Sequence, residues 1–252
     1  MDIVIIGSGN AAAVLGRVFK AAKHNIVQVY SRNAQAASAL AYEWDTESTN
    51  YKSMVSRLGD VYIIAVNDDA IADVADDLFL PGKVVAHTAA SVPAAALQKV
   101  TDHYGVFYPL QSLRKEDISL PAIPVFYDGN TEKARRILES LALSIAPEHT
   151  TQAGDDRRLK LHVAAVVVNN FANHLYALAE DYCKKEGLNF RELLPLIQET
   201  TDRLISTSPK DAQTGPALRQ DTATISQHLA LLEPYPRLRK VYEQLTASIQ
   251  QG

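Results

Sequence analysis

A glycine-rich turn near the start of the chain constrains the fold more than any other feature. The apolar run over residues 2–6 predicts a buried strand, residues 11–23 predict a helix, and between them the sequence reads G-x-G-x-x-A. In a strand–turn–helix unit, this pattern predicts dinucleotide binding. Small residues let the backbone approach a pyrophosphate, and the helix N-terminus offers it free N–H groups. The predicted cofactor-binding residues are Gly7, Ser8, Gly9, Asn10 and Ala11. The alternative is a glycine turn in a nucleotide-free α/β domain.

The end of the second predicted strand, residues 26–30, indicates which dinucleotide is bound. A chain that binds NAD places Asp or Glu about 20 residues after the glycine turn, where it holds the ribose 2′-hydroxyl. Here Ser31 and Arg32 follow the strand and no acid is present. A hydroxyl and a guanidinium suit a 2′-phosphate. We therefore predict NADP as the cofactor, with an exposed turn arginine as the alternative.

The first 150 residues alternate short apolar runs with helical patterns. This alternation predicts an α/β domain with a Rossmann-type parallel sheet covered on both faces. Further strands are expected at residues 61–66, 83–87, 105–108 and 123–127, with a last edge strand at 144–146; helices are expected at residues 34–42, 68–78 and 131–143.

The second part of the chain changes character near residue 150. From residue 151 onward we expect only helices, including a long apolar one over 159–178 and others at residues 190–206, 217–232 and 236–249. The predicted domains are therefore 1–150, a cofactor-binding domain, and 151–252, an all-α domain for substrate binding and dimerisation.

Composition excludes several classes of protein. Hydrophobic residues make up 47% and charged residues 21% of the 252, and the net charge is −4. This balance argues against nucleic acid and anionic membranes as partners. The single cysteine, Cys183, and the lack of a recognisable signal peptide favour the cytoplasm. Without a Cys/His cluster, no metal site is predicted.

Polar residues at the carboxyl ends of the central strands are candidates for the active site, because ligands of open α/β sheets bind there. Asn67 and Thr88 are predicted to contact the nicotinamide half of the cofactor. The same rule selects the loop at residues 108–112. Asp68 is either a ligand contact or a helix cap, and Asp69 could cap the same helix. His87 is either a proton donor, since imidazole titrates near neutral pH, or a structural residue bonded to the backbone.

The long helix of the second domain carries polar residues among its valines. Regular helical spacing would align His162, Asn169 and Asn173, and would pair Asn170 with His174. If buried, these groups need partners, because unpaired polar groups are costly in an apolar environment. The alternatives are a structural network and a ligand site.

A second candidate segment follows a predicted loop at residues 209–216. Thr214 is expected to cap a helix whose first residue is Pro216. The free N–H groups there, together with Arg219, would attract a substrate carboxylate or phosphate. An ordinary capped helix is the alternative.

Several of these segments together resemble a known family. They are IVIIGSGN, VYIIAVNDDAI, VVAHTAAS, YPLQSL, HVAAVVVNNFANHLYALAED and QTGPALRQD. They are similar to NADP-dependent oxidoreductases with an N-terminal Rossmann-like domain and a C-terminal helical domain of unknown function. More distant similarity extends to pyrroline-5-carboxylate reductase, deazaflavin-dependent NADP reductases and 6-phosphogluconate-type dehydrogenases. The resemblance covers nearly the whole chain and implies a homodimer formed through the helical half.

The chain departs from this wider superfamily at two places. Relatives often carry a lysine and an asparagine one turn apart on the first helix after the Rossmann domain, but here Lys160 is followed by Ala164. Ala89 and Ala90 stand where relatives carry Ser-Gly. The lysine mechanism is therefore not transferred to this chain.

These observations predict an NADP-dependent oxidoreductase that transfers a hydride between NADP(H) and a small C=O or C=N substrate. His162 or His87 would supply the proton, and Asn170 would orient the substrate. The alternative function is a non-catalytic NADP-binding sensor. For either function, we expect His162, Asn170 and the 214–219 segment to converge near the nicotinamide.

Overall fold

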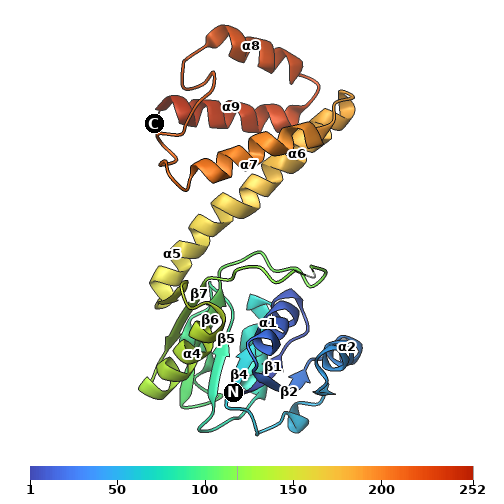
Figure 1. The fold of residues 1–252 in the computed structure, drawn as a ribbon, viewed down its shortest axis with the longest axis vertical. Helices are drawn as coiled ribbons and strands as arrows, with labels where there is room; N and C mark the ends of the chain where they lie inside the picture. Colours follow the sequence, from blue (N-terminus) through green and yellow to red (C-terminus); the bar gives the residue numbers. More distant parts are fainter. Residues whose placement is uncertain (118, 252) are drawn as a thin grey trace. The chain divides into compact units, whose positions relative to one another are not determined.

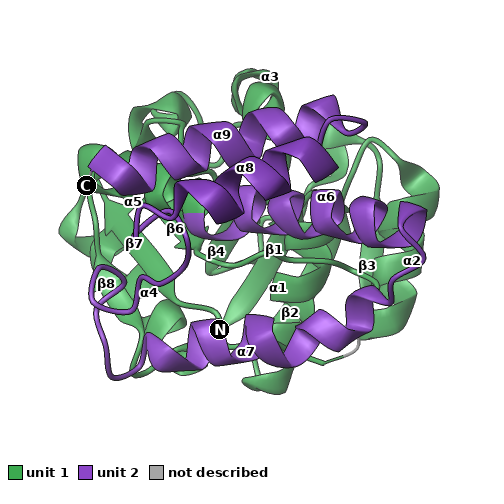
Figure 2. Cartoon of the chain, turned by 90° about the horizontal axis from the view of Figure 1, so that it is seen from above, with its two compact units in different colours: residues 1–167 green, residues 168–252 purple. Residues whose placement is uncertain are grey.

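The computed structural model describes residues 1–117 and 119–251 (Figure 1). The chain forms two compact units, residues 1–167 and residues 168–252 (Figure 2). The division falls within a helical stretch, so the first helix after the sheet belongs to the first unit. The two units are described separately below.

An eight-stranded sheet forms the centre of the first unit, in the order β3-β2-β1-β4-β5-β6-β7-β8. Neighbouring strands are parallel except for β6 and β7, which pair antiparallel. The predicted Rossmann-type α/β fold is confirmed, with this one antiparallel pair as the departure. The strands are β1 (Asp2–Ile6), β2 (Asn25–Tyr30), β3 (Glu47–Thr49), β4 (Val61–Ile64), β5 (Val84–His87), β6 (His103–Pro109), β7 (Val125–Gly129) and β8 (Thr150–Gln152).

Both faces of the sheet are buried, as continuous apolar strands require. Side chains alternate between faces along each strand. In β1, Ile3 and Ile5 therefore join one core and Val4 and Ile6 join the other. Figure 1 shows helices of the first unit covering the sheet. Its helices are α1 (Asn10–Ala21), α2 (Ala34–Trp44), α3 (Ile71–Asp77), α4 (Glu132–Ile145) and α5 (Asp155–Ala165), with short 3₁₀ turns η1 (Lys52–Met54), η2 (Asp68–Ala70) and η3 (Ala94–Leu97).

Close packing joins α1 to α2 at a glycine. The ring of Trp44, which is buried, covers Gly16 so closely that a Cβ atom there would lie 2.2 Å from the ring. Glu43 accepts a hydrogen bond from the Trp44 indole N–H at 3.2 Å and pairs with Arg17 on α1. The α1–α2 contact therefore depends on the absence of a side chain at residue 16.

The structure corrects three expectations within the first unit. Residues 144–146 do not form an edge strand, because Ser144 and Ile145 end α4 and Ala146 caps it. The last strand of the sheet is β8, which is short and polar. A second short polar strand, β3, was not expected at all. Asp68 and Asp69 also do not cap a helix through their side chains, because Asn67 precedes the 3₁₀ turn without a side-chain cap bond.

A π-helical turn, η4 (Val166–Phe171), lies between α5 and α6 (Ala172–Lys185). A π turn contains more residues than an α turn, so it shifts the faces of the residues that follow. The alignment of His162 with Asn169 and Asn173 assumed regular 3.6-residue spacing and is therefore wrong. Asn169, Asn170, Asn173 and His174 are all exposed on the isolated chain.

The second unit is helical, as predicted. After α6 it contains η5 (Phe190–Leu193), α7 (Leu194–Arg203), α8 (Thr222–Leu231) and α9 (Pro236–Gln251). Helix α8 begins five residues later than predicted, because Asp221 is its N-cap and accepts a hydrogen bond from the Thr224 N–H at 3.0 Å. Pro216 instead lies in a turn closed by the Asp221 N–H. The expectation of a helix start at Thr214–Pro216 is therefore wrong.

Among the described residues, no helix is both long enough and apolar enough to cross a membrane.

Candidate cofactor and active site

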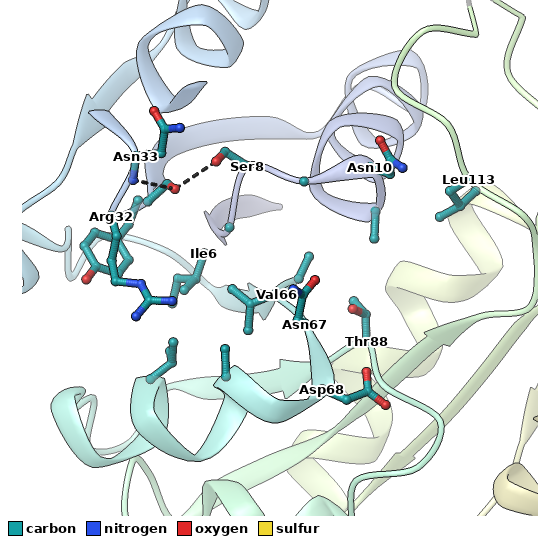
Figure 3. A pocket seen from close by; sticks show the side chains of 18 of the residues that line it. Ile6, Ser8, Asn10, Arg32, Asn33, Val66, Asn67, Asp68, Thr88 and Leu113 are labelled. Carbon is teal, nitrogen blue, oxygen red and sulfur yellow. Dashed lines mark hydrogen bonds between the residues drawn. The ribbon is translucent and has the colours of Figure 1, made fainter. Parts of the chain in front are cut away.

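A cavity of about 760 Å³ lies at the carboxyl ends of the central strands. This is the edge of an open α/β sheet where ligands bind, next to the point where the strand order reverses around β1. The cavity is lined by all nine residues predicted to bind the cofactor: Gly7, Ser8, Gly9, Asn10, Ala11, Ser31, Arg32, Asn67 and Thr88. Figure 3 shows several of their side chains converging on it from separate elements.

The two glycines of the turn fit a dinucleotide for different reasons. Gly7 has a φ of +127°, and a Cβ atom there would lie 2.1 Å from the carbonyl oxygen of Ala65 on the neighbouring strand. Gly9 has ordinary backbone angles, and a Cβ atom there would meet nothing within 4 Å. Gly7 is thus required by the fold, whereas Gly9 leaves free space beside the N-terminus of α1. The turn therefore suits a diphosphate that approaches the backbone.

The wall beyond β2 suits a phosphorylated ribose. The hydroxyls of Ser8 and Ser31 are 2.8 Å apart, and Arg32 also lines the cavity. Asn33 also lines the cavity, but its side-chain oxygen caps α2 by accepting from the Ala36 N–H at 3.0 Å. Among the described residues that line this wall, none carries a carboxylate of the kind that binds the ribose 2′-hydroxyl of NAD. The residues present therefore fit NADP.

The segment after β6 covers the start of α1, which sequence reasoning did not foresee. The Lys115 N–H donates to the Asn10 side-chain oxygen at 3.3 Å, and Arg17 donates to the Lys115 carbonyl oxygen at 2.6 Å. Gln111 and Leu113 of the same segment line the cavity. The Asn10 side chain thus holds this segment in place while its backbone opens the helix.

His87 is a structural histidine rather than a proton donor. It is fully buried, Ala89 donates its N–H to Nδ1 at 3.2 Å, and Nε2 faces the Pro93 carbonyl oxygen at 3.3 Å. This pattern fits the neutral imidazole with the proton on Nε2. Burial lowers the pKa of His87 from 6.5 to about 4. With both nitrogens bonded to the backbone, His87 has none left for a substrate.

Arg158 holds the loop that follows β5. Its side chain is buried and donates from Nε to the Ala90 carbonyl oxygen at 3.2 Å and from Nη2 to the Val92 carbonyl oxygen at 2.7 Å. Asp155 accepts from Arg158 at 2.8 Å and from the Ala94 N–H at 3.2 Å. The first turn of α5 therefore fixes the loop that begins at Thr88, and no local sequence pattern indicated this long-range contact.

His162 contacts a tyrosine at the carboxyl end of β6. Tyr108 Oη lies 3.1 Å from His162 Nδ1, and the two rings meet edge to face with centroids 6.1 Å apart. Burial raises the pKa of the Tyr108 hydroxyl, and the charge of Asp68 raises it further. His162 does not line the cavity itself, but Tyr108 adjoins Pro109, which does. The imidazole is half-buried, so it is not packed away in the core.

The remaining predicted residues lie in the second unit. Asn170, Thr214 and Arg219 are exposed there. Because α8 begins at Thr222, Thr214 does not open a helix, and Arg219 lies two residues before the N-cap Asp221, on which its charge acts. The expected convergence of these residues on the nicotinamide stays a prediction.

Two family models match the chain. Residues 2–91 match the model described as NADP oxidoreductase, coenzyme F420-dependent, and residues 123–249 match the domain of unknown function DUF2520. A candidate NADP oxidoreductase from Bacteroides fragilis is 36% identical, with a TM-score of 0.91 over 100% of this chain and 98% of that one. This chain belongs to the same family. By family it is an NADP-dependent oxidoreductase, and neither model identifies its substrate.

More distant structures share the fold. A 1-pyrroline-5-carboxylate reductase from Streptococcus pyogenes is 14% identical with a TM-score of 0.63, over 100% of this chain and 99% of that one. A reductive aminase from Aspergillus terreus, in complex with NADPH4, cyclohexanone and allyl amine, is 17% identical with a TM-score of 0.71. The match covers 99% of this chain and 92% of that one. No functionally curated protein matches the chain significantly.

Proposed function

We propose that the protein uses NADPH to reduce a small molecule that carries a C=N or C=O group. One observation carries the proposal: the nine residues predicted to bind NADP line one cavity at the strand ends, with Arg32 at its ribose wall. When bound, NADPH supplies a hydride to such a group. The distant structures that share the fold include imine reductases and a reductive aminase, which supports a C=N or C=O substrate for this chain as well.

His162 is the proton donor in this proposal. Its Nδ1 faces Tyr108, so Nε2 is free to face a substrate. A positioned acid of this kind accelerates reactions by roughly 10²–10⁴-fold. The structural role of His87 leaves His162 as the better of the two predicted histidines. Asn170 would orient the substrate, and Thr214 and Arg219 remain candidates for a substrate anion.

A second copy of the chain completes the assembly in this proposal. Among the described residues of the second unit only Cys183, Ala217 and Leu232 are buried, while large apolar side chains such as Leu196 and Ile205 are 66% and 88% exposed. Helices that bury so little of their apolar surface need a partner surface. We therefore propose a homodimer through the helical unit. The free thiol of Cys183 is consistent with the cytoplasm.

Cofactor titration tests the proposal directly. NADPH should bind at least about tenfold more tightly than NADH, because a charge-assisted contact between Arg32 and the 2′-phosphate is worth about 1.5 kcal/mol or more. Arg32→Asp should erase or reverse this preference. Arg57→Asp is the matched control, since Arg57 is exposed in the same unit and does not line the cavity. Equal affinities in the parent protein would refute the 2′-phosphate site.

A turnover assay distinguishes an enzyme from a non-catalytic NADP-binding sensor. NADPH oxidation should be followed by absorbance with 2-methyl-1-pyrroline as a C=N probe and cyclopentanone as a C=O probe. Oxidation with either probe that His162→Gln reduces supports the enzyme and its acid. Tight NADPH binding without turnover of a broad panel of imines and carbonyls would favour a sensor.

A further inference from the structure

The cavity carries opposite charges at two places along the strand ends. Among the described residues that line it, Arg32 and Asp68 are the charged ones. Arg32 follows β2 and Asp68 follows β4, with β1 between them in the sheet. Adjacent strands are about 4.8 Å apart, so the two elements leave the sheet about 10 Å from each other. In Figure 3 the two side chains lie toward opposite sides of the cavity.

Asp68 is available to a ligand because it has no role as a helix cap. The side chain is exposed, and one carboxylate oxygen accepts a hydrogen bond from the Ser91 hydroxyl. The other carboxylate oxygen accepts no hydrogen bond from the described residues. Ser91 lies in the loop that Arg158 holds, so this contact places the carboxylate beside a fixed part of the wall. Thr88 lines the cavity at the start of that loop.

The carboxylate of Asp68 also acts on groups that do not line the cavity. The charge of Asp68 acts on Tyr108, which contacts His162. Arg158, whose charge also acts on Tyr108, is buried and donates to two loop carbonyls and to Asp155. Its Nη1 has no hydrogen-bond partner among the described residues. A ligand at this end of the cavity therefore meets the carboxylate of Asp68, whereas neither Tyr108 nor His162 lines the cavity.

We propose that Asp68 selects a cationic substrate, an iminium ion, for which His162 would protonate the C=N nitrogen before the hydride is transferred. This inference rests on the proposed function and decides between its two substrate types. In the reaction, the iminium carbon gains a hydride, the C=N π electrons become the nitrogen lone pair, and a neutral amine forms as NADPH is oxidised to NADP⁺. The positive charge on the substrate disappears. A ketone would instead gain negative charge on its oxygen, which a nearby carboxylate opposes.

Binding of three ring compounds of similar size tests this selection. The protein is saturated with NADPH, and pyrrolidinium, cyclopentanone and cyclopentanecarboxylate are titrated while the fluorescence of bound NADPH is recorded. Pyrrolidinium should bind about tenfold more tightly than cyclopentanone, as expected for one charge-assisted hydrogen bond, and the carboxylate should bind most weakly. Asp68→Asn should remove the advantage of pyrrolidinium, and Asp68→Glu should retain it.

Asp69→Asn is the matched control. Asp69 is an exposed acid on the same 3₁₀ turn and does not line the cavity, so its loss should leave all three affinities unchanged. An unchanged pyrrolidinium affinity in Asp68→Asn, or a preference of the parent for the carboxylate, overturns the inference. Failure of NADPH itself to bind the parent would instead overturn the proposed function. A far-ultraviolet circular dichroism spectrum and a melting temperature like those of the parent show that Asp68→Asn is folded.

Discussion

Gly7 and Gly9 stand two residues apart and should respond to the same substitution in opposite ways. Gly7→Ala places a Cβ atom 2.1 Å from a carbonyl oxygen at a positive φ, so we expect a loss of at least about 2 kcal/mol in the free energy of unfolding. Gly9→Ala meets open space and should fold normally. It should nevertheless weaken NADPH binding about tenfold, because the methyl group enters the space that a diphosphate needs. Chemical denaturation and cofactor titration measure the two effects. Normal NADPH affinity in Gly9→Ala would place the diphosphate elsewhere.

His87 should make the stability of the fold depend on pH. Its pKa is about 4 in the folded protein, against 6.5 ordinarily, because burial disfavours the charged imidazole. Between these values the unfolded chain binds a proton that the folded chain does not. The free energy of unfolding should therefore fall as pH drops from 6.5 to 4, by up to about 3 kcal/mol. Denaturation at several pH values measures the slope, and His87→Gln should flatten it. If the free energy of unfolding of His87→Gln still falls over this pH range, other groups cause the effect.

At the scale of single elements, α8 offers a test of where a helix begins. The Asp221 side chain accepts from the Thr224 N–H, and capping bonds of this kind contribute about 1 kcal/mol. Asp221→Ala should lower the free energy of unfolding by about that amount, whereas Thr214→Ala should have almost no effect. Thermal unfolding of the two variants provides the comparison. A larger loss of stability in Thr214→Ala than in Asp221→Ala would instead support a helix that begins near Thr214.

The elements that the sequence predicted well are those with long, regular patterns. The apolar run of β4 and the G-x-G-x-x-A turn made the position of the cofactor cavity predictable, because strand ends meet at one edge of a parallel sheet. The short strands β3 and β8 were missed because their residues are polar and their pairing is decided by neighbouring strands. The predicted strand at residues 144–146 failed because the Ser144 hydroxyl bonds back to the Leu141 carbonyl oxygen within the helix.

The site was predictable only in part for the same reason. Residues that follow a strand directly, such as Asn67 and Thr88, were found from their position. The loop at residues 108–112 was selected in the same way, but the contact of Tyr108 with His162 was not predicted. This contact and those of Arg158 join segments far apart in the sequence, and no spacing rule reveals such contacts. The π turn at 166–171 has no sequence signature that regular helical periodicity detects.

At the scale of the whole molecule, assembly follows from how little the helical unit buries. We expect a particle of about 55 kDa, twice the chain mass of 27.6 kDa, by light scattering at micromolar concentration. Leu196→Lys should shift this species toward a monomer, because it places a charge on an apolar surface that would be covered in a dimer. Tyr42→Lys is the control, since Tyr42 is 89% exposed on the first unit. A parent protein that scatters as a monomer contradicts the proposed dimer.

The single tryptophan makes the two units optically distinct. Trp44 is buried at the end of α2, in the unit that holds the cavity, and the helical unit has no indole. Intrinsic tryptophan emission therefore reports the state of the first unit alone, whereas far-ultraviolet circular dichroism is weighted toward the helices of both. Reduced nicotinamide absorbs where tryptophan emits, so bound NADPH should quench Trp44 by resonance energy transfer. One fluorescence channel thus follows cofactor capture without a label, and a mismatch between the two spectroscopic melting curves would reveal that the units unfold separately.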